Sequence, residues 1–370
     1  MTRTSVAVIA LGCVAMAVAP AYSRPRATPP LPASPMVPAN YRTVKLADGV
    51  YAFIAPIETS VVSGNSLLVI GDDGALVVDT QQFAAVARWE VAEIRKLTAQ
   101  PVRYVINTHW HNDHWLGNAT FREAWPDAMV LATPNTRRLV IEKGVGDVDP
   151  AKAGEQLAQL DAMLADRKQK LAPLARRYLE VARDELRDYI PAMKQARPEP
   201  PAATFDHAFT VYLGAREVDV RFLGRGNTGG DAVVYVPDAK VVATGDLVVH
   251  PVPFAFGSFI TEWASTLGKL AELDATAIVP GHGELQHDMH YVRALAAALA
   301  SISAQAQAAQ AAGKPIEQAR KTVDVHAFER ETCGDDPWCH LGFPGAFVQP
   351  AFDRAFREAK DGPLRDENED

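Results

Sequence analysis

Residues 107–118 read NTHWHNDHWLGN. Their metal-capable side chains are His109, His111, Asp113 and His114. Imidazole nitrogens and carboxylate oxygens are the ligands of Zn²⁺ and similar divalent ions. The preceding stretch PVRYVI (101–106) is rich in β-branched residues and predicts a buried strand. A strand that ends in such a loop presents these side chains at the edge of a sheet, so we expect the loop to serve two neighbouring ions.

Two later segments also place a metal-capable side chain directly after a predicted strand. KVVATGD (240–246) ends at Asp246, and ATAIVPGH (275–282) ends at His282. One such residue means little, because Asp is common in turns. Recurrence behind successive buried strands favours a shared site at one sheet edge.

A glycine-rich segment, GRGNTGGD (224–231), matches the spacing G-x-G-x-x-G. The dinucleotide-binding fingerprint requires a helix after these glycines. Here the strand-like stretch DAVVYVP (231–237) follows, so the sequence argues against a dinucleotide site.

The rest of the chain alternates strand and helix patterns, which predicts a layered α/β arrangement. Residues 136–200 interrupt it with charged, helical sequence whose apolar stripe at 157–181 predicts about two helices separated near Pro173. We interpret this insertion as a flap over the site edge; a coiled-coil partner surface is the alternative. The other predicted elements are hairpins around 48–49, 73–74 and Gly214, and helices at 83–97 and about 288–312.

The H-x-H-x-D-H string, with VVDT (77–80), TGD (244–246) and PGHG (280–283), resembles the metallo-β-lactamase superfamily. The resemblance covers most of 41–312 and implies an α/β fold: an αββα sandwich of the metallo-β-lactamase type, here with a helical insertion. It also implies two metal sites at one edge. The first would use His109 and His111, and the second Asp113, His114 and His282, with Asp246 bridging both ions.

One position departs from the family pattern. Dinuclear members complete the first site with a third histidine from the loop between the halves, and Asn227 stands there in this chain. An amide oxygen is a weaker zinc ligand than imidazole. Asn227 is either a weak metal ligand or a turn residue that does not touch metal. We therefore expect one or two Zn²⁺ ions, with the ion at His109 and His111 the weaker.

The resemblance implies a metal-dependent hydrolase, most simply a zinc enzyme, in which water activated by metal attacks a carbonyl-type bond. Asp113 and Asp246 would orient that water and handle its proton. The substrate would be a small molecule: a β-lactam, a lactone or a thioester. Two alternatives stay open, namely a mononuclear iron oxidoreductase of the sulfur dioxygenase kind on the same fold, and a metal-binding module that has lost catalysis.

Composition and the N-terminus indicate where such a protein would act. The net charge of −8 provides no basic field for nucleic acid, and 48% hydrophobic residues suffice for a sizeable core. The first residues combine Arg3, an apolar run at 6–18 and small residues at 19–23, which is typical of a cleaved secretory signal. The run is short for a bilayer span. We expect a periplasmic or secreted protein with no membrane attachment after cleavage.

Cys333 and Cys339 would remain after cleavage and lie in the turn-rich stretch CGDDPWC. In an exported protein such a pair predicts a short disulfide loop. A zinc knuckle with His340 is the competing interpretation, but it lacks a second Cys/His pair nearby. The expected organisation is a signal peptide at 1–23, a Pro-rich linker at 24–40, the metallo-β-lactamase-like domain at 41–320 with its insertion at about 136–200, and a C-terminal extension at 321–370.

Overall fold

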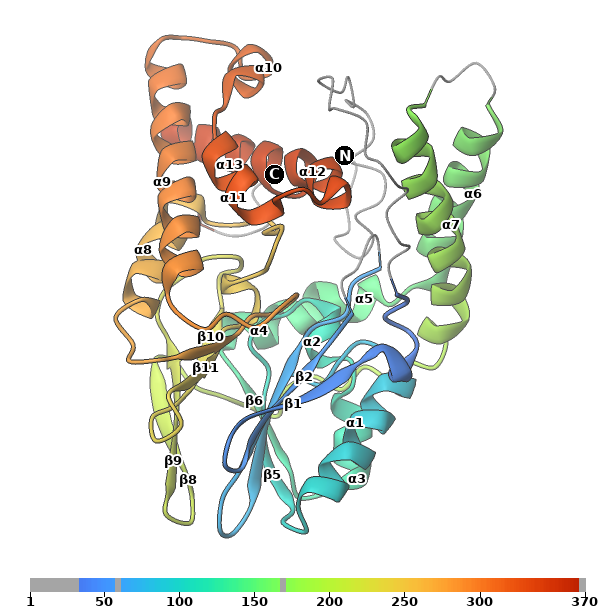
Figure 1. The fold of residues 1–370 in the computed structure, drawn as a ribbon, viewed down its shortest axis with the longest axis vertical. Coiled ribbons are helices and arrows are strands. Elements are labelled where there is room, and N and C mark those ends of the chain that lie inside the picture. Colours follow the sequence, from blue (N-terminus) through green and yellow to red (C-terminus); the bar gives the residue numbers. More distant parts are fainter. Residues whose placement is uncertain (1–32, 57–60, 167–170, 366–370) are drawn as a thin grey trace.

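The computed structural model describes residues 33–56, 61–166 and 171–365. The predicted signal peptide and most of the predicted linker lie outside these residues. Two mixed β-sheets form the centre of the molecule (Figure 1). Among the described residues, none of the helices combines the length and apolar character needed to cross a bilayer.

The first sheet has seven strands in sequence order. Its strands are antiparallel from β1 to β4 and parallel from β4 to β7. Their bounds are β1 (Arg42–Ala47), β2 (Val50–Ile54), β3 (Ser66–Ile70), β4 (Ala75–Val78), β5 (Val102–Ile106), β6 (Met129–Ala132) and β7 (Ala203–Thr204). Gly49, with φ of 69°, makes the predicted turn between β1 and β2, because glycine adopts this left-handed conformation without strain.

The second sheet has five strands in the order β12-β11-β10-β9-β8. Only the pair formed by β11 and β12 is parallel. The bounds are β8 (Ala208–Leu213), β9 (Arg216–Phe222), β10 (Ala232–Val236), β11 (Val241–Ala243) and β12 (Ala277–Val279). Strand β10 follows the glycine-rich segment, as predicted, where the dinucleotide fingerprint requires a helix.

The two sheets pack face to face, and helices cover both outer faces. In β3, Leu67 and Val69 face the second sheet, whereas Leu68 packs with the helices outside. Burial on both faces explains why β3 is apolar from Leu67 to Ile70. The outer helices are α1 (Ala84–Leu97) and α3 (Asn118–Ala124) on the first sheet, and α8 (Ile260–Leu270) and α9 (His290–Ala311) on the second. The αββα sandwich is therefore confirmed.

The helical insertion lies between β6 and β7. Its elements are α4 (Pro134–Leu139), the π-helix η2 (Val140–Gly144), α5 (Val145–Asp147), α6 (Pro150–Ala165) and α7 (Pro173–Met193). Helix α7 starts at Pro173, where a proline costs no hydrogen bond. The sequence suggested that the insertion separates two strand-rich halves, but β7 follows it and still pairs with β6 of the first sheet. A two-residue strand leaves no periodicity to detect.

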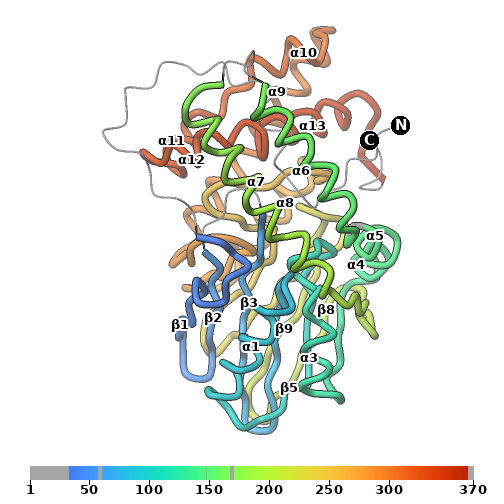
Figure 2. The backbone as a smooth tube through the Cα atoms, turned by 90° about the vertical axis from the view of Figure 1, so that its right-hand side faces the viewer, coloured from blue at the N-terminus to red at the C-terminus, as the bar shows by residue number. Residues whose placement is uncertain are grey.

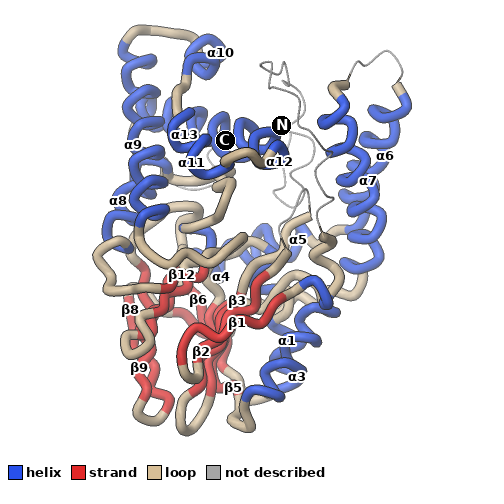
Figure 3. The backbone as a smooth tube through the Cα atoms, in the orientation of Figure 1, coloured by secondary structure: helices blue, strands red, loops and turns tan. Residues whose placement is uncertain are grey.

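The C-terminal residues are helical and pack on α8 and α9. Their elements are α10 (Ile316–Ala319), α11 (His326–Cys333), α12 (Pro337–Phe343), the π-helix η5 (Pro344–Val348) and α13 (Gln349–Asp361). Figures 2 and 3 show α6 and α7 rising beside these helices, beyond the same end of the sheets. Inside α13, Arg354 donates to the backbone oxygens of Gly257 and Ser258 at 3.1 and 3.0 Å, which ties the extension to the sandwich.

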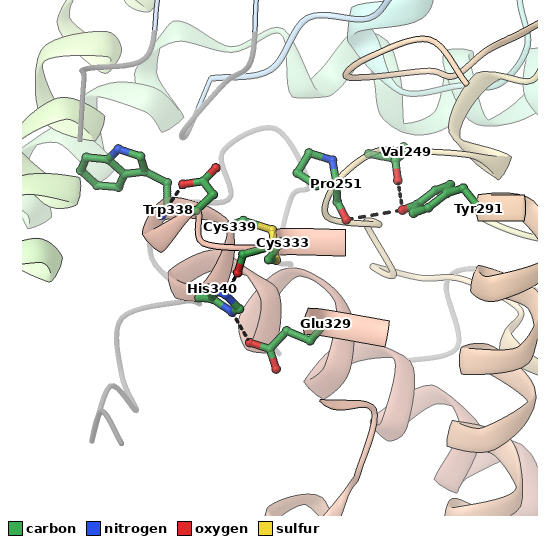
Figure 4. The surroundings of a disulfide bond; sticks show 10 residues. Val249, Pro251, Tyr291, Glu329, Cys333, Trp338, Cys339 and His340 are labelled. Atoms are coloured by element: carbon green, nitrogen blue, oxygen red, sulfur yellow. Dashed lines mark hydrogen bonds and ion pairs between the residues drawn. A yellow bond between two sulfur atoms is a disulfide. The ribbon is translucent and has the colours of Figure 1, made fainter. Parts of the chain in front are cut away.

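The predicted disulfide between Cys333 and Cys339 is present and links α11 to α12 (Figure 4). Both cysteines are buried, and their Cα atoms are 5.4 Å apart. The ring nitrogens of His340 lie 2.9 Å from Glu329 Oε1 and from Gly334 O. Since both sulfurs are bonded to each other, the zinc-knuckle interpretation is wrong.

Candidate metal centre

Four short segments bring the predicted ligands to one edge of the sandwich. His109 and His111 follow β5, and the short helix α2 (Asn112–Trp115) carries Asp113 and His114. Asp246 lies in the 3₁₀ helix η3 (Gly245–Leu247) after β11, and His282 follows β12. Backbone hydrogen bonds from Asn65 to Gly281 O and from Gly281 to Gly245 O join these loops across the two sheets.

These side chains form two adjoining groups, each able to hold a metal ion. The first cluster is His109, His111 and Asp246, and the second cluster is Asp113, His114 and His282. Within each cluster the ligand atoms all lie within 4.8 Å of one another. In the first, His109 Nε2 is 2.9 Å from His111 Nδ1. In the second, Asp113 Oδ2 is 3.0 Å from His282 Nε2 and 3.2 Å from His114 Nε2.

Asp246 lies between the two clusters. Its Oδ2 is 3.5 Å from His109 Nε2, while its Oδ1 is 3.3 Å from His114 Nε2 and 3.4 Å from His282 Nε2. One carboxylate oxygen therefore faces each cluster, which is the geometry of a carboxylate shared by two cations.

Burial and charge favour cations at this centre. Burial lowers the pKa of His109 to about 3, so its imidazole is neutral at pH 7 and can donate a lone pair. Burial disfavours the charged form of Asp113, but His114 and His282 outweigh that cost and hold the pKa of Asp113 well below its usual range. Among the described residues, no Lys or Arg is paired with Asp113 or Asp246.

Asp79, directly after β4, orients two of the histidines. Its role was not predicted from the sequence. Its Oδ2 is 2.7 Å from His114 Nδ1 and accepts a hydrogen bond from Thr108 Oγ1, whose oxygen lies 3.0 Å from His109 Nδ1. These contacts occupy the Nδ1 atoms and leave Nε2 of His109 and His114 facing the clusters. The VVDT motif was the available signal, but its spacing from the histidines hid the contact.

Asn227 is buried close to the second cluster's His282, with Phe254 between them. Its Nδ2 donates to Phe254 O at 2.5 Å, and the Phe254 ring lies 5.3 Å from the His282 ring. The amide Oδ1 is buried and accepts no hydrogen bond among the described residues. A buried acceptor without a donor is uncommon. Asn227 thus keeps a free oxygen, although no contact places it against His109 or His111.

The tryptophans of the histidine loop belong to packing around the site. Trp115 is fully buried, and its Nε1 donates to Trp110 O at 2.9 Å. Both indoles belong to one apolar cluster with Tyr178 and Leu186 of α7, which places the insertion directly against the histidine loop. His250 is also outside the clusters: its ring packs 5.0 Å from that of Tyr291.

An αββα sandwich with two His/Asp clusters at one edge defines a class of metal-binding α/β proteins. A model of the metallo-beta-lactamase superfamily matches residues 59–282, more than half of the chain. The chain therefore belongs to the metallo-beta-lactamase superfamily.

Named relatives are distant. A linear primary-alkylsulfatase from Pseudomonas sp. (strain ATCC 19151) is 25% identical over 234 residues, which are 59% of this chain and 41% of that protein. The chain thus spans about two fifths of the length of this relative. A metallo-beta-lactamase structure from Pontibacter korlensis has a TM-score of 0.50 at 18% identity, covering 70% of this chain and 99% of that one. The DIM-1 metallo-beta-lactamase has a TM-score of 0.48 at 19% identity, covering 70% and 97%. The structural likeness concerns the fold alone.

Proposed function

We propose that this protein is a metal-dependent hydrolase whose two clusters hold zinc ions. One observation carries the proposal: Asp113 Oδ2 and Asp246 Oδ1 are buried, accept no well-oriented hydrogen bond, and are surrounded by imidazoles. Buried carboxylates are costly unless nearby cations offset their charge. Two divalent ions would relieve that cost, and mixed imidazole and carboxylate donors suit zinc.

The ligand assignment follows from the clusters. His109, His111 and Asp246 would hold one ion, and Asp113, His114 and His282 the other, with Asp246 shared. Asn227 Oδ1 is one further buried oxygen without a hydrogen-bond donor among the described residues. We propose it as a weak ligand of the first ion, although its neighbour Phe254 contacts His282 of the second cluster. The first ion is then the weaker of the two, because an amide replaces an imidazole.

The chain's own groups have clear tasks in such a hydrolysis. Divalent ions bound here supply Lewis acidity, which activates water at neutral pH and stabilises developing negative charge. Asp113 and Asp246 would orient the attacking water and take up its proton, since both have an oxygen without a hydrogen-bond donor. Asp79 keeps His114 in the required tautomer.

We propose a small-molecule substrate with a carbonyl-type bond: a β-lactam, lactone or thioester. A sulfate ester is the second candidate, and the similarity to an alkylsulfatase supports it. The N-terminal pattern and the disulfide support export to the periplasm or beyond the cell. An iron oxidoreductase on this fold is the competing assignment, and metal analysis of protein purified without added metal decides between zinc and iron.

The test is hydrolysis of a cephalosporin, a lactone, a thioester and an alkyl sulfate by zinc-loaded protein. We expect activity on at least one of them, its loss on chelation and its return with Zn²⁺. Asp113→Asn and His282→Ala should each lower kcat by about 100-fold or more. His326→Ala, an exposed histidine on α11, is the matched control and should change nothing. Activity that survives chelation, or full activity in His282→Ala, would overturn the proposal.

A further inference from the structure

The start of the insertion is held tightly against the histidine loop. A Cβ added to Gly144 in η2 would lie 2.8 Å from Trp115 Cζ2 and 3.3 Å from Asn112 Oδ1, so the backbone here leaves no room for a side chain. Val140, at the other end of η2, is fully buried in the same apolar cluster as Trp110 and Trp115. π-helical turns are rare in proteins, and those that occur often lie at functional sites. The residues of η2 are therefore candidates for a role at the metal centre.

Lys143 of η2 reaches the face of Trp110. Its Nζ lies 5.1 Å from the centroid of the Trp110 rings, within the range of a cation–π contact. The ring of Trp110 also contacts that of His111, with the two centroids 4.7 Å apart. Trp110 therefore contacts both Lys143 and a residue of the first cluster. The side chain of His111 is 11% exposed, whereas those of His109 and His114 are at 0%, so the centre is most open here.

Lys143 forms no ion pair with any carboxylate whose side chain the structure describes. The adjacent Glu142 pairs with Arg138 at 2.7 Å instead. The side chain is partly exposed. An ammonium group fixed on an aromatic face and left without a counter-ion can pair with an incoming anion.

We propose that Lys143 is a specificity-determining residue that binds an anionic group of the substrate, so that the site selects organic anions: sulfates, sulfonates or carboxylates. A role of Lys143 in substrate selection rests on the proposed function. The binding of an anion by Lys143 can be measured without turnover. An electrostatic contact at the rim of the centre would act mainly on substrate affinity and less on the chemical step.

The test is calorimetric titration of zinc-loaded protein with three six-carbon probes: hexane-1-sulfonate, hexanoate and the neutral hexan-1-ol. Lys143→Met keeps the length of the side chain and its packing on Trp110 but removes the charge, and Lys143→Arg keeps the charge. Lys152→Met on α6 is the control, because Lys152 is an exposed lysine of the same insertion whose Nζ donates to Gly146 O.

We expect Lys143→Met to weaken binding of at least one anion about tenfold, while Lys143→Arg, Lys152→Met and all hexan-1-ol titrations match the wild type. If Lys143→Met weakens the binding of only the sulfonate or only the carboxylate, that result identifies the head group that Lys143 binds. Unchanged anion binding in Lys143→Met, or an equal loss for hexan-1-ol, would overturn the inference and leave Lys143 a packing residue.

This outcome is separable from failure of the proposed function. If no substrate is hydrolysed but anion binding depends on Lys143, the inference stands and the hydrolase proposal fails. If hydrolysis is observed but Lys143→Met changes KM equally for anionic and neutral substrates, the hydrolase proposal stands and the inference fails.

Discussion

Among single residues, Asn227 is the one that we propose makes the first ion weaker than the second. Its amide nitrogen is committed to Phe254 O, which leaves only the neutral Oδ1 for metal. We predict that Asn227→His tightens the weaker zinc ion, because imidazole is the stronger donor. Calorimetric titration of Zn²⁺ into the metal-free wild type and the variant measures this. The control is Asn135→His, which adds a histidine on α4.

Two equally tight ions in the wild type, unaffected by Asn227→His, would show that this position does not limit metal binding. The activity of the variant decides nothing here, because a stronger ligand can raise or lower turnover.

A second residue, Glu90 on α1, makes stability depend on pH. It is fully buried, accepts a hydrogen bond from Ser66 Oγ at 2.8 Å on Oε1, and its Oε2 accepts no well-oriented hydrogen bond from the described residues. Burial raises its pKa to about 8 from 4.5. Between these values the folded state keeps a proton that the unfolded state loses, so the free energy of unfolding falls as the pH rises.

We predict that Glu90→Gln stabilises the protein at pH 9 by roughly 1–4 kcal/mol and changes little near pH 5, since an amide cannot ionise. Urea unfolding at the two pH values measures the difference from wild type. Glu272→Gln, at an exposed glutamate, should show no such pH dependence. The same stability difference at both pH values would mean that Glu90 is not protonated in the folded protein.

At the scale of elements, the insertion and the C-terminal extension approach one another next to the site. The rings of Tyr178 in α7 and Trp338 in α12 are 6.4 Å apart, and Trp338 packs against the apolar cluster that contains Trp110. The Cys333–Cys339 bond holds α11 and α12 in the hairpin that carries Trp338 (Figure 4). The disulfide therefore holds together two helices that pack on the sandwich and that also carry Trp338 towards the cluster around Trp110.

We predict that replacing both cysteines by serine lowers the free energy of unfolding by about 2 kcal/mol. This is the contribution expected when a disulfide that closes so short a loop no longer restricts the unfolded chain. Hydrogen exchange should rise in α11 and α12, while zinc content stays the same because no ligand lies on these helices. Adding reductant to the double variant is the control and should have no further effect. Unchanged exchange in α11 and α12 would show that packing alone holds the hairpin.

For the whole molecule, the sequence predicted those elements that carry a clear local pattern, such as a hairpin turn or a stretch of β-branched residues. The DG turns predicted the hairpins that β1 forms with β2 and β3 with β4, and the β-branched stretch PVRYVI predicted β5. The C-terminal helices after α9 were not predicted as elements, and neither was β7. Their stability comes from packing on α8, α9 and β6 rather than from a local signal.

For the site, too, the residues with a recognisable sequence signal were predicted, whereas contacts between distant parts of the chain were not. All the histidines and aspartates of both clusters were predicted, because each follows a recognisable strand and matches a family motif. The contacts of Asp79 and Lys143 were not, since both reach the histidine loop from distant sequence positions. Side chains that orient or flank ligands become visible only when the chain is folded.

In the proposed metal centre, two buried clusters bind two metal ions. Asp246 is common to both clusters, and all the other ligands belong to one cluster each. Native mass spectrometry of zinc-reconstituted protein counts the ions directly. We predict two zinc ions per chain in the wild type, with one lost in His111→Ala and the other lost in His282→Ala. Wild type without zinc, or the same count in all three proteins, would contradict the account.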